Sequence, residues 1–298
     1  MNGLLVVDKP GGMTSHDVVN RLRKITGERS IGHLGTLDPM ATGVLPLLMG
    51  KYTRLAQYFS AAEKSYTGTI RFGFATDSYD AEGESAGLDV WPEFSDSVTV
   101  DAVRVEATRF LGESMQMPPA FSAKKIDGKP AYKLAREGKV PELKAARVRI
   151  DCFEVTVMEG AEASFKMTIS AGGYVRSVAH ELGHALGCGA HLAVLRRVQA
   201  GVFIIEQAHT LEELQALAGQ VGELESLCVH PRSLLTEMPA VTADAQALGK
   251  LRNGAQANLA DFSQASLVKV FASQTELVGV AKRVAGTLFQ PVVVFSGQ

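Results

Sequence analysis

The chain has 298 residues, of which 46% are hydrophobic, and a formal net charge of −2, values that predict one large globular domain with a small companion. The N-terminus MNGLLVVDKP lacks the features of a signal peptide, and no stretch offers about 18 uninterrupted apolar residues, so we exclude a membrane protein and expect a cytoplasmic one. Cys152, Cys188 and Cys228 form no C-x-x-C pair, which excludes a disulfide framework and predicts buried free thiols.

The predicted elements begin with a buried strand at LLVVDK and a helix over TSHDVVNRLRKITG, with Thr14 or Ser15 as the N-cap and Gly27 at the end. A glycine-containing loop follows over residues 29–43. Hydrophobic periodicity and turn signals then predict, in chain order, strand LPLLMG, helix YTRLAQYFSAAE, strand YTGTIRFG, an acidic excursion at 77–97, helix VDAVRVEATRFLG, hairpin FSAKKIDGKP, strands RVRIDCFEVTVME and ASFKMTIS, helix VRSVAHELGHALG, strand LAVLRRVQAGVF and helix TLEELQALAG.

A change of composition near HPRSLLTEMPA, where Pro231 and Pro239 enclose a linker, predicts a domain boundary. Beyond it we expect helix ADAQALGKLRNG and strands in SLVKVFAS, ELVGVAKRVAG and LFQPVVVF. The chain is therefore predicted to have an α+β (mixed α/β) fold, with domains at residues 1–232 and 240–298.

Charge is unevenly distributed along the chain. Residues 124–149 contain nine Lys or Arg against three acidic residues, whereas residues 77–113 contain ten acidic residues against two Arg. A solvated helix face is the ordinary explanation of a basic segment, and a contact with nucleic acid is the other.

The segment His180-Glu181-Leu182-Gly183-His184 has the H-E-x-x-H form of zinc peptidases, in which two His bind the metal and the Glu acts as general base. The extended pattern needs a third His at position 190, where the chain has Ala190, and the side chain of His191 would point elsewhere. We therefore favour a helix with two polar positions facing solvent or RNA, with a zinc metallopeptidase as the alternative.

The loop Gly32-His33-Leu34-Gly35-Thr36-Leu37-Asp38-Pro39 presents a carboxylate on a constrained backbone, because Pro39 favours an extended Asp38 and the glycines permit close approach to a ligand. A turn cap explains Asp38 equally well. Arg176 falls in the first turn of its helix, where a cation opposes the helix dipole, so an acidic partner is expected. Asp38 is a candidate partner, and the pair would keep it ionised by lowering its pKa; a purely structural ion pair is the alternative.

Two tyrosines lie beside these features. Tyr66 follows Lys64 at the start of a predicted strand, and Tyr174 precedes the helix of Arg176. Aromatic rings next to basic residues can stack on an extruded base, although buried tyrosines more often pack in a core. The residues alone leave both explanations open.

Most of the chain resembles the bacterial TruB-type family of tRNA pseudouridine synthases. The similar motifs, in the family's order, are LLVVDKPGGMTSHDVV, GHLGTLDPMATGVLPLLMG, KSYTGTIRFGFATDSYDAEGE, QMPPAFSAKKIDGKPAYKLAREG, SAGGYVRSVAHELG and GAHLAVLRRVQAGVF. The resemblance implies a pseudouridine synthase catalytic fold with a central mixed, mainly antiparallel sheet, followed by a small β-rich RNA-binding domain of PUA-like type. Gly173 departs from the family, where Thr is frequent.

The resemblance also implies roles for individual residues. It matches Asp38 to the catalytic aspartate, Arg176 to its ion-pair partner and Tyr66 to the active-site tyrosine. His33 matches the pocket histidine, and substrate-contact positions fall on Tyr174 and Leu195. Glu181 matches the acidic position of a family helix and His180 a variable one, which makes the zinc-like motif a coincidence.

The implied reaction breaks the N1–C1′ bond of one uridine in the T loop of tRNA (position 55), turns the uracil and joins C5 to C1′. It involves no net redox change, so we expect no cofactor and no metal. Asp38 attacks a carbon of the nucleotide or removes a ribose proton, and both routes stay open. The uridine is extruded from its stack, and phosphate contacts are expected from Lys64, Lys124, Lys125 and Lys129.

The expected partner is therefore tRNA, bound by a monomer with no obligate protein partner and no membrane. A non-catalytic RNA-binding or chaperone protein is a further alternative, although the intact set of Asp38, Tyr66 and Arg176 argues against it. A guide-RNA-dependent enzyme acting on ribosomal RNA is conceivable within the family, but nothing in the chain suggests the accessory proteins.

Overall fold

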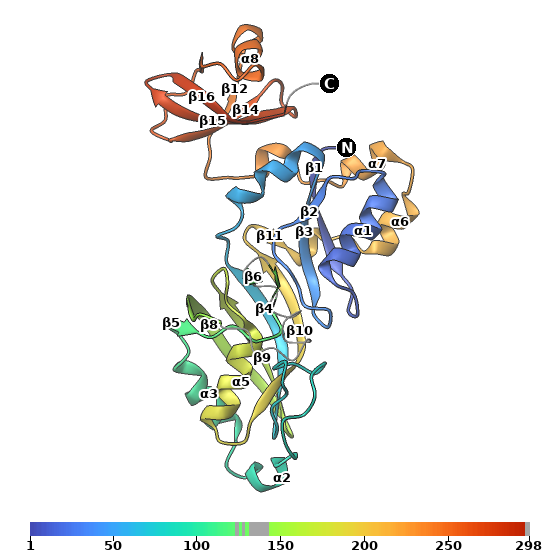
Figure 1. Ribbon diagram of the computed structural model, residues 1–298, viewed down its shortest axis with the longest axis vertical. Helices are drawn as coiled ribbons and strands as arrows, with labels where there is room; N and C mark the ends of the chain where they lie inside the picture. Colours follow the sequence, from blue (N-terminus) through green and yellow to red (C-terminus); the bar gives the residue numbers. More distant parts are fainter. Residues whose placement is uncertain (123–124, 127–128, 131–142, 296–298) are drawn as a thin grey trace.

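The computed structural model describes residues 1–122, 125–126, 129–130 and 143–295. Its main feature is a nine-stranded sheet of order β1-β3-β10-β4-β9-β8-β5, with β2 paired to β3 and β11 paired to β10 (Figure 1). The strands are β1 (Gly3–Lys9), β2 (Ile31–His33), β3 (Thr42–Met49), β4 (Lys64–Phe72), β5 (Gly112–Gln116), β8 (Ala146–Glu159), β9 (Glu162–Ile169), β10 (Ala190–Ala200) and β11 (Phe203–Ile204). Among these strands, β10 and β3 pair in parallel and the other pairs are antiparallel. The expected mixed, mainly antiparallel sheet is thus confirmed.

Helices cover the sheet near its two ends. In Figure 1, α1, α6 and α7 lie near β1, and α3 and α5 lie near β8 and β9. The helices are α1 (Ser15–Thr26), α2 (Trp91–Phe94), α3 (Val100–Thr108), α5 (Val175–Ala185), α6 (Leu211–Ala216) and α7 (Val221–Ser226), with 3-10 turns η1 (Gly50–Tyr58) and η2 (Ile205–Gln207). No helix in the described part of the chain is long and apolar enough to cross a membrane.

The ends of helix α1 are fixed by the capping residues in its sequence. Thr14 is the N-cap of α1: its hydroxyl accepts from the backbone N–H of Asp17, and the Asp17 carboxylate accepts from the backbone N–H of Thr14. Gly27 ends the helix in the left-handed conformation, with a φ of 71°. Thr14, one of the two candidates from the sequence, is therefore the N-cap, which leaves the Ser15 side chain free to point into the core.

A second sheet follows, with order β12-β14-β15-β16-β13. It comprises β12 (Ala240–Thr242), β13 (Ala257–Asn258), β14 (Leu267–Phe271), β15 (Leu277–Ala285) and β16 (Leu288–Val294), together with helix α8 (Ala245–Arg252). It packs on the first sheet through a shared apolar cluster in which the rings of Tyr52 and Phe295 stack 5.1 Å apart. The buried Lys269 Nζ donates to the carbonyls of Arg232 and Leu234 at 2.8 and 2.6 Å. The segment expected to be a linker, which contains η3 (Pro231–Ser233), is therefore anchored.

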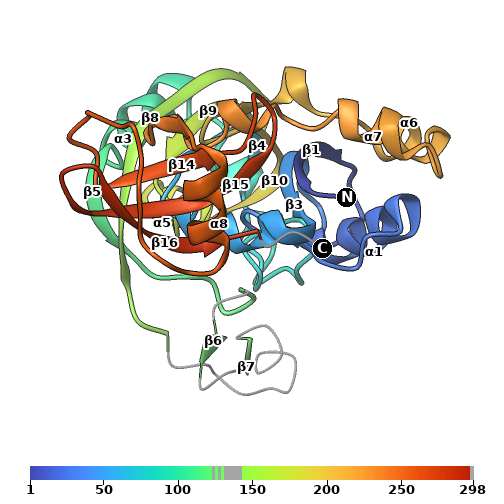
Figure 2. The ribbon, with the colours of Figure 1, turned by 90° about the horizontal axis from the view of Figure 1, so that it is seen from above.

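The short hairpin of β6 (Lys125–Ile126) and β7 (Lys129–Pro130) matches the hairpin expected there. Figure 2 shows it set apart from both sheets.

Some elements differ from their sequence prediction. The helix expected over residues 52–63 is the 3-10 segment η1, and the loop expected at 29–43 contains the short strand β2. Strand β5 was not predicted, because its sequence GESMQ shows no apolar alternation and four of its five residues are exposed. Of the three cysteines, Cys188 is buried as expected, while Cys152 and Cys228 are only half-buried.

Candidate active site

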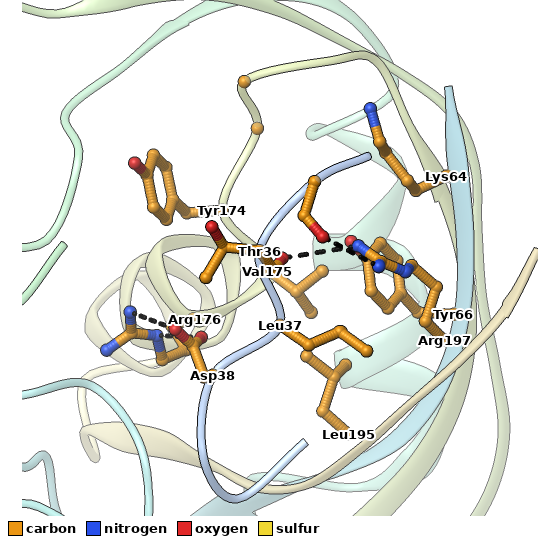
Figure 3. A pocket seen from close by; sticks show the side chains of 13 residues that line it. Thr36, Leu37, Asp38, Lys64, Tyr66, Tyr174, Val175, Arg176, Leu195 and Arg197 are labelled. Atoms are coloured by element: carbon orange, nitrogen blue, oxygen red, sulfur yellow. Dashed lines mark hydrogen bonds and ion pairs between the residues drawn. The ribbon is translucent and has the colours of Figure 1, made fainter. Parts of the chain in front are cut away.

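A pocket of about 240 Å³ opens where the loop before β3 meets β4, β10 and the start of α5 (Figure 3). Its lining residues are Gly35, Thr36, Leu37, Asp38, Lys64, Tyr66, Gly172, Gly173, Tyr174, Val175, Arg176, Leu195 and Arg197. The residues come from four separate parts of the chain. The sheet order therefore assembles this pocket, since β4 and β10 are neighbours.

Asp38 and Arg176 form a two-point ion pair in this pocket. Arg176 Nε lies 2.9 Å from Asp38 Oδ2, and Arg176 Nη2 donates to Asp38 Oδ1 at 3.1 Å. The guanidinium side chain is buried, at 4% exposure, whereas the Asp38 side chain keeps 32% exposure toward the pocket. The acidic partner expected for an arginine in the first turn of a helix is therefore present, and it is Asp38.

Arg176 also binds a second carboxylate. Its Nη1 lies 3.0 Å from Asp80 Oδ2 and donates to the Ser78 carbonyl at 2.9 Å, while Nη2 donates to the Phe121 carbonyl at 3.0 Å. Asp80 is itself buried and accepts from the Ser78 hydroxyl at 2.6 Å. These contacts fix the guanidinium plane, so the two oxygens of Asp38 are held in one orientation.

The loop that carries Asp38 is tied to the first helix and the first strand. The Ser15 hydroxyl donates to the Leu37 carbonyl at 3.1 Å and accepts from the Leu37 N–H at 2.8 Å. Lys9, which is fully buried, donates from Nζ to the Pro39 carbonyl at 3.1 Å. Both neighbours of Asp38 in the chain are thus restrained. Burial lowers the pKa of Lys9 to about 8, and the nearby Asp38 opposes that shift.

The pKa of Asp38 differs from the sequence expectation. Burial raises it above its usual value, and the positive charge of Arg176 is the largest influence in the opposite direction. The ion pair thus acts with the expected sign, but desolvation of the carboxylate outweighs it. The expectation of a lowered pKa was therefore wrong.

Tyr66 and Leu195 form the apolar side of the pocket from the paired strands β4 and β10. Tyr66 is buried, at 9% exposure, and sits opposite Arg197 in the β4–β10 register, next to Leu195 and Gly68. Burial raises the pKa of the Tyr66 hydroxyl, and Arg197 opposes that shift through its charge and a side-chain hydrogen bond. The flat ring of Tyr66 and the carboxylate of Asp38 therefore lie on opposite sides of one pocket.

Tyr174 is placed by the edge strand β5. Gln116 Oε1 accepts from the Tyr174 backbone N–H at 2.8 Å, and Gln116 Nε2 donates to the Tyr174 carbonyl at 3.0 Å. This amide therefore fixes the backbone at the point where α5 begins. At the adjacent Gly173, a Cβ atom would lie 2.3 Å from Ile169 Cδ1, so the more frequent Thr would require Ile169 to move.

Comparison with known families agrees with this geometry. The N-terminal domain of TruB family pseudouridylate synthases matches residues 23–175, and the tRNA pseudouridylate synthase B C-terminal domain matches residues 176–236. The tRNA pseudouridine synthase B of Solibacter usitatus is 42% identical over 297 residues, covering 99% of this chain and 100% of the relative. The chain belongs to the TruB family. The enzyme of the same name from Opitutus terrae is 45% identical over 217 residues, 73% of this TruB-family chain and 88% of the relative.

Solved structures extend the similarity to the fold. An H/ACA ribonucleoprotein bound to a substrate RNA containing 2′-deoxyuridine matches with a TM-score of 0.70 and 25% identity, covering 99% of this chain and 85% of that one. A Cbf5–Nop10–Gar1 complex matches with a TM-score of 0.69 and 26% identity, covering 99% and 84%. The pseudouridine synthase fold and the enzyme class expected for this TruB-family chain are thereby confirmed.

The structure does not bring every predicted site residue to the pocket. Asp38, Lys64, Tyr66, Tyr174, Arg176 and Leu195 line it. His33 lies in β2 opposite Leu47 and is not among the lining residues. Lys124 lies outside the described residues, and only the backbone is described for Lys125 and Lys129. Sequence reasoning missed Lys9, Asp80, Gln116 and Arg197.

The zinc-like segment of this TruB-family chain lies on α5, and its residues His180 and Gly183 have roles in packing. The ring of His180 stacks on Tyr79 with centroids 3.8 Å apart, so only His184 of the two faces solvent as expected. A Cβ atom on Gly183 would lie 2.2 Å from the backbone N of Ala190, so this glycine allows α5 to approach β10. Within the described ranges, no group of three or more His, Cys, Asp or Glu side chains is placed to hold a metal ion.

Proposed function

We propose that this protein converts one uridine in the T loop of tRNA, position 55, to pseudouridine, with Asp38 as its essential carboxylate. The observation that carries the proposal is the two-point ion pair of Asp38 with a buried Arg176, facing an aromatic wall across one pocket. Such a site offers an oriented carboxylate and a flat surface for a base. Those are the two elements that the isomerisation of a uridine requires.

The reaction needs Asp38 in its ionised form. Arg176 holds it in place for either of two routes, attack on a carbon of the nucleotide or removal of a ribose proton. Neither route changes the net oxidation state, so the chemistry is supplied by the side chains of this chain. No cofactor is part of the proposal.

Access to the uridine requires extrusion from the stacked T loop, at a cost of a few kcal/mol. Stacking of the uracil on Tyr66 offsets part of this cost. Contacts of the uridine with Tyr174 and Leu195 at the pocket wall offset a further part. We assign to Tyr66 a second task, the transfer of the C5 proton. We assign to His33, which lies outside the pocket lining, the task of filling or bracing the site that the extruded base leaves.

The proposed division of labour assigns catalysis to residues 1–232 and RNA binding of PUA-like type to residues 240–298. The five-stranded sheet with α8 supports a separate role for the second segment. Lys64 lines the pocket, and we expect it to contact a phosphate together with Lys124, Lys125 and Lys129. We place the enzyme in the cytoplasm as a monomer without an obligate protein partner.

Mapping of pseudouridine in an unmodified tRNA transcript after incubation with the enzyme tests this function. We expect one modified position, in the T loop, and none in a transcript whose T-loop uridine is replaced by cytidine. Modification elsewhere, with the T loop untouched, would assign the enzyme to another substrate.

The rate should depend on pH through Asp38. Because burial raises the pKa of Asp38, the carboxylate takes up its proton at a higher pH than an exposed aspartate would, and the active form is lost as pH falls through that value. The single-turnover rate is therefore expected to decline on the acidic side at a pH above the ordinary aspartate pKa of about 3.9. A rate that stays constant down to about pH 4 would contradict the proposed role of the ionised form.

Replacement of Lys124, Lys125 and Lys129 by Gln should weaken tRNA binding and flatten its salt dependence. Each lysine that contacts a phosphate contributes about 0.7 to 0.9 to the slope of log affinity against log salt. A matched control changes Arg21, Lys24 and Arg29, which are exposed around α1, to Gln and removes the same net charge. An equal fall in slope for both triple variants would place the phosphate surface elsewhere.

A further inference from the structure

Arg197 is a fully buried cation bound mainly by carbonyl groups. It is 1% exposed, and it donates from Nε to the Val44 carbonyl at 2.7 Å, from Nη1 to the Thr36 carbonyl at 3.3 Å and from Nη2 to the Gly35 carbonyl at 3.1 Å. In the part of the chain that the structure describes, no salt bridge joins it to a carboxylate. A buried charge without a counter-ion is costly, so this arginine calls for a functional explanation.

The neighbouring arginines show the contrast. Arg176 lies between Asp38 and Asp80. Arg196, adjacent in β10, forms a two-point contact with Asp8, with distances of 3.1 and 2.7 Å. Among these three arginines, Arg197 is the one whose described partners are carbonyl groups without a carboxylate, and carbonyl dipoles compensate its charge only in part.

Its backbone is held in place as firmly as its side chain. Gly43, opposite Arg197 in the β3–β10 pairing, would carry a Cβ atom only 2.2 Å from the Arg197 carbonyl oxygen. The close approach of these strands lets the guanidinium reach the carbonyls of the Asp38 loop. Arg197 thus connects that loop to β10, the strand paired with β4.

Arg197 lies beside Tyr66 in the sheet. The two residues are register partners in β10 and β4, and both line the pocket (Figure 3). Arg197 and burial act in opposite directions on the pKa of the Tyr66 hydroxyl, with Arg197 favouring the phenolate. Lys64 is the other cation on this side, and its own pKa is lowered by burial and by Arg197. The Tyr66 side of the pocket therefore combines apolar side chains with two cations, Lys64 and Arg197, opposite the carboxylate side.

We propose that Arg197 is a positioning residue for Tyr66, which orients its hydroxyl toward the uracil and stabilises negative charge on its oxygen during removal of the C5 proton. The inference rests on the proposed function. After C5 is joined to C1′, the ring holds an N1–C6 double bond and a hydrogen on C5. Tyr66 gives its proton to N1 and then takes the C5 proton; the C5–H pair becomes the C5–C6 double bond, and the N1–C6 π pair returns to N1. Protons and electrons balance without another reactant.

A double-mutant cycle tests this coupling. Single-turnover release of tritium from a tRNA transcript labelled at uridine C5 is measured for Tyr66→Phe, Arg197→Met and the double variant. We expect Arg197→Met to slow release about 100-fold in the wild-type background and less than about threefold in the Tyr66→Phe background, because the charge then has no hydroxyl to act on. An equal loss in both backgrounds would overturn the proposal.

The controls separate this role from a structural one. Arg196→Met removes the neighbouring arginine on β10 and should leave the rate within about twofold of wild type. Should Arg197→Met fail to fold, Arg197→Lys replaces it, because lysine keeps the charge but lacks the planar guanidinium. The second readout is the kinetic isotope effect on the single-turnover rate when uridine C5 carries deuterium. We expect a larger isotope effect with Arg197→Lys than with wild type, and an unchanged one would contradict the proposal. Wild-type enzyme that releases no tritium would instead refute the proposed function itself.

Discussion

Asp38→Asn is expected to abolish pseudouridine formation, with a loss of at least about 10³-fold in single-turnover rate. The amide has the size of the carboxylate and stays within reach of Arg176, but it carries no charge and is a poor nucleophile and base. The pocket and the RNA surface are unchanged, so tRNA affinity should stay within about threefold of wild type. Rapid-quench assays with filter binding measure both quantities on the same transcript.

Asp101→Asn is the matched control for this substitution. Asp101 is 83% exposed and pairs with Arg104 at 3.3 Å on α3, so the same chemical change there should leave the rate unaltered. An active Asp38→Asn enzyme would end the proposed mechanism. A variant that loses tRNA binding together with activity would show that Asp38 acts in binding.

Arg176→Met is expected to have the second large effect, on both stability and rate. It leaves Asp38 and the buried Asp80 without their shared counter-ion, and removal of one partner from a buried ion pair costs about 3–5 kcal/mol. The pKa of Asp38 should rise further, because the largest influence that lowers it is lost. Denaturant unfolding gives the free energy of unfolding, and single-turnover assays give the rate.

A double variant separates the two effects of this substitution. Arg176→Met with Asp80→Asn removes one of the two unpaired charges and should recover part of the free energy of unfolding, while the rate stays low because Asp38 has no partner. Arg109→Met is the surface control, because the Arg109 side chain is 72% exposed and forms an ion pair with Glu106. Full recovery of activity in the double variant would show that Arg176 serves stability alone.

The sequence alone made Asp38 a candidate partner of Arg176, and the family resemblance then assigned the pair. A cation in the first turn of a helix needs an anion, and Pro39 marked Asp38 as a restrained carboxylate. The second carboxylate had no such signal. Asp80 lies in an acidic segment where nothing in the composition distinguishes it from its neighbours, and it reaches Arg176 only through the fold.

Buried cations were harder to predict than the carboxylate. Lys9 ends an apolar strand and Arg197 lies within one, and a charged residue at such a place usually faces solvent. Their burial depends on carbonyl groups from residues far along the chain, such as Pro39 and Val44. The i, i+2 relation of Leu195 and Arg197 on one strand face was the available signal.

Prediction of the fold succeeded where periodicity is clear. Alternating strands such as β8 and the capped helix α1 were found, and the antiparallel character of the sheet followed from the family resemblance. The edge strand β5 was missed because all its residues but Gln116 are exposed and they show no apolar alternation. The segment η1 was taken for an α-helix because both helix types share their apolar spacing over one or two turns.

The most direct test of Asp38-dependent isomerisation is release of tritium from uridine C5 in an unmodified tRNA transcript. The proposed reaction replaces the C5 hydrogen with the bond to C1′, so wild-type enzyme should release one tritium per tRNA, at a position that maps to the T loop. The Asp38→Asn enzyme should release none above background while it still binds the transcript. Absence of release from the wild type, or equal release from both enzymes, would contradict the account.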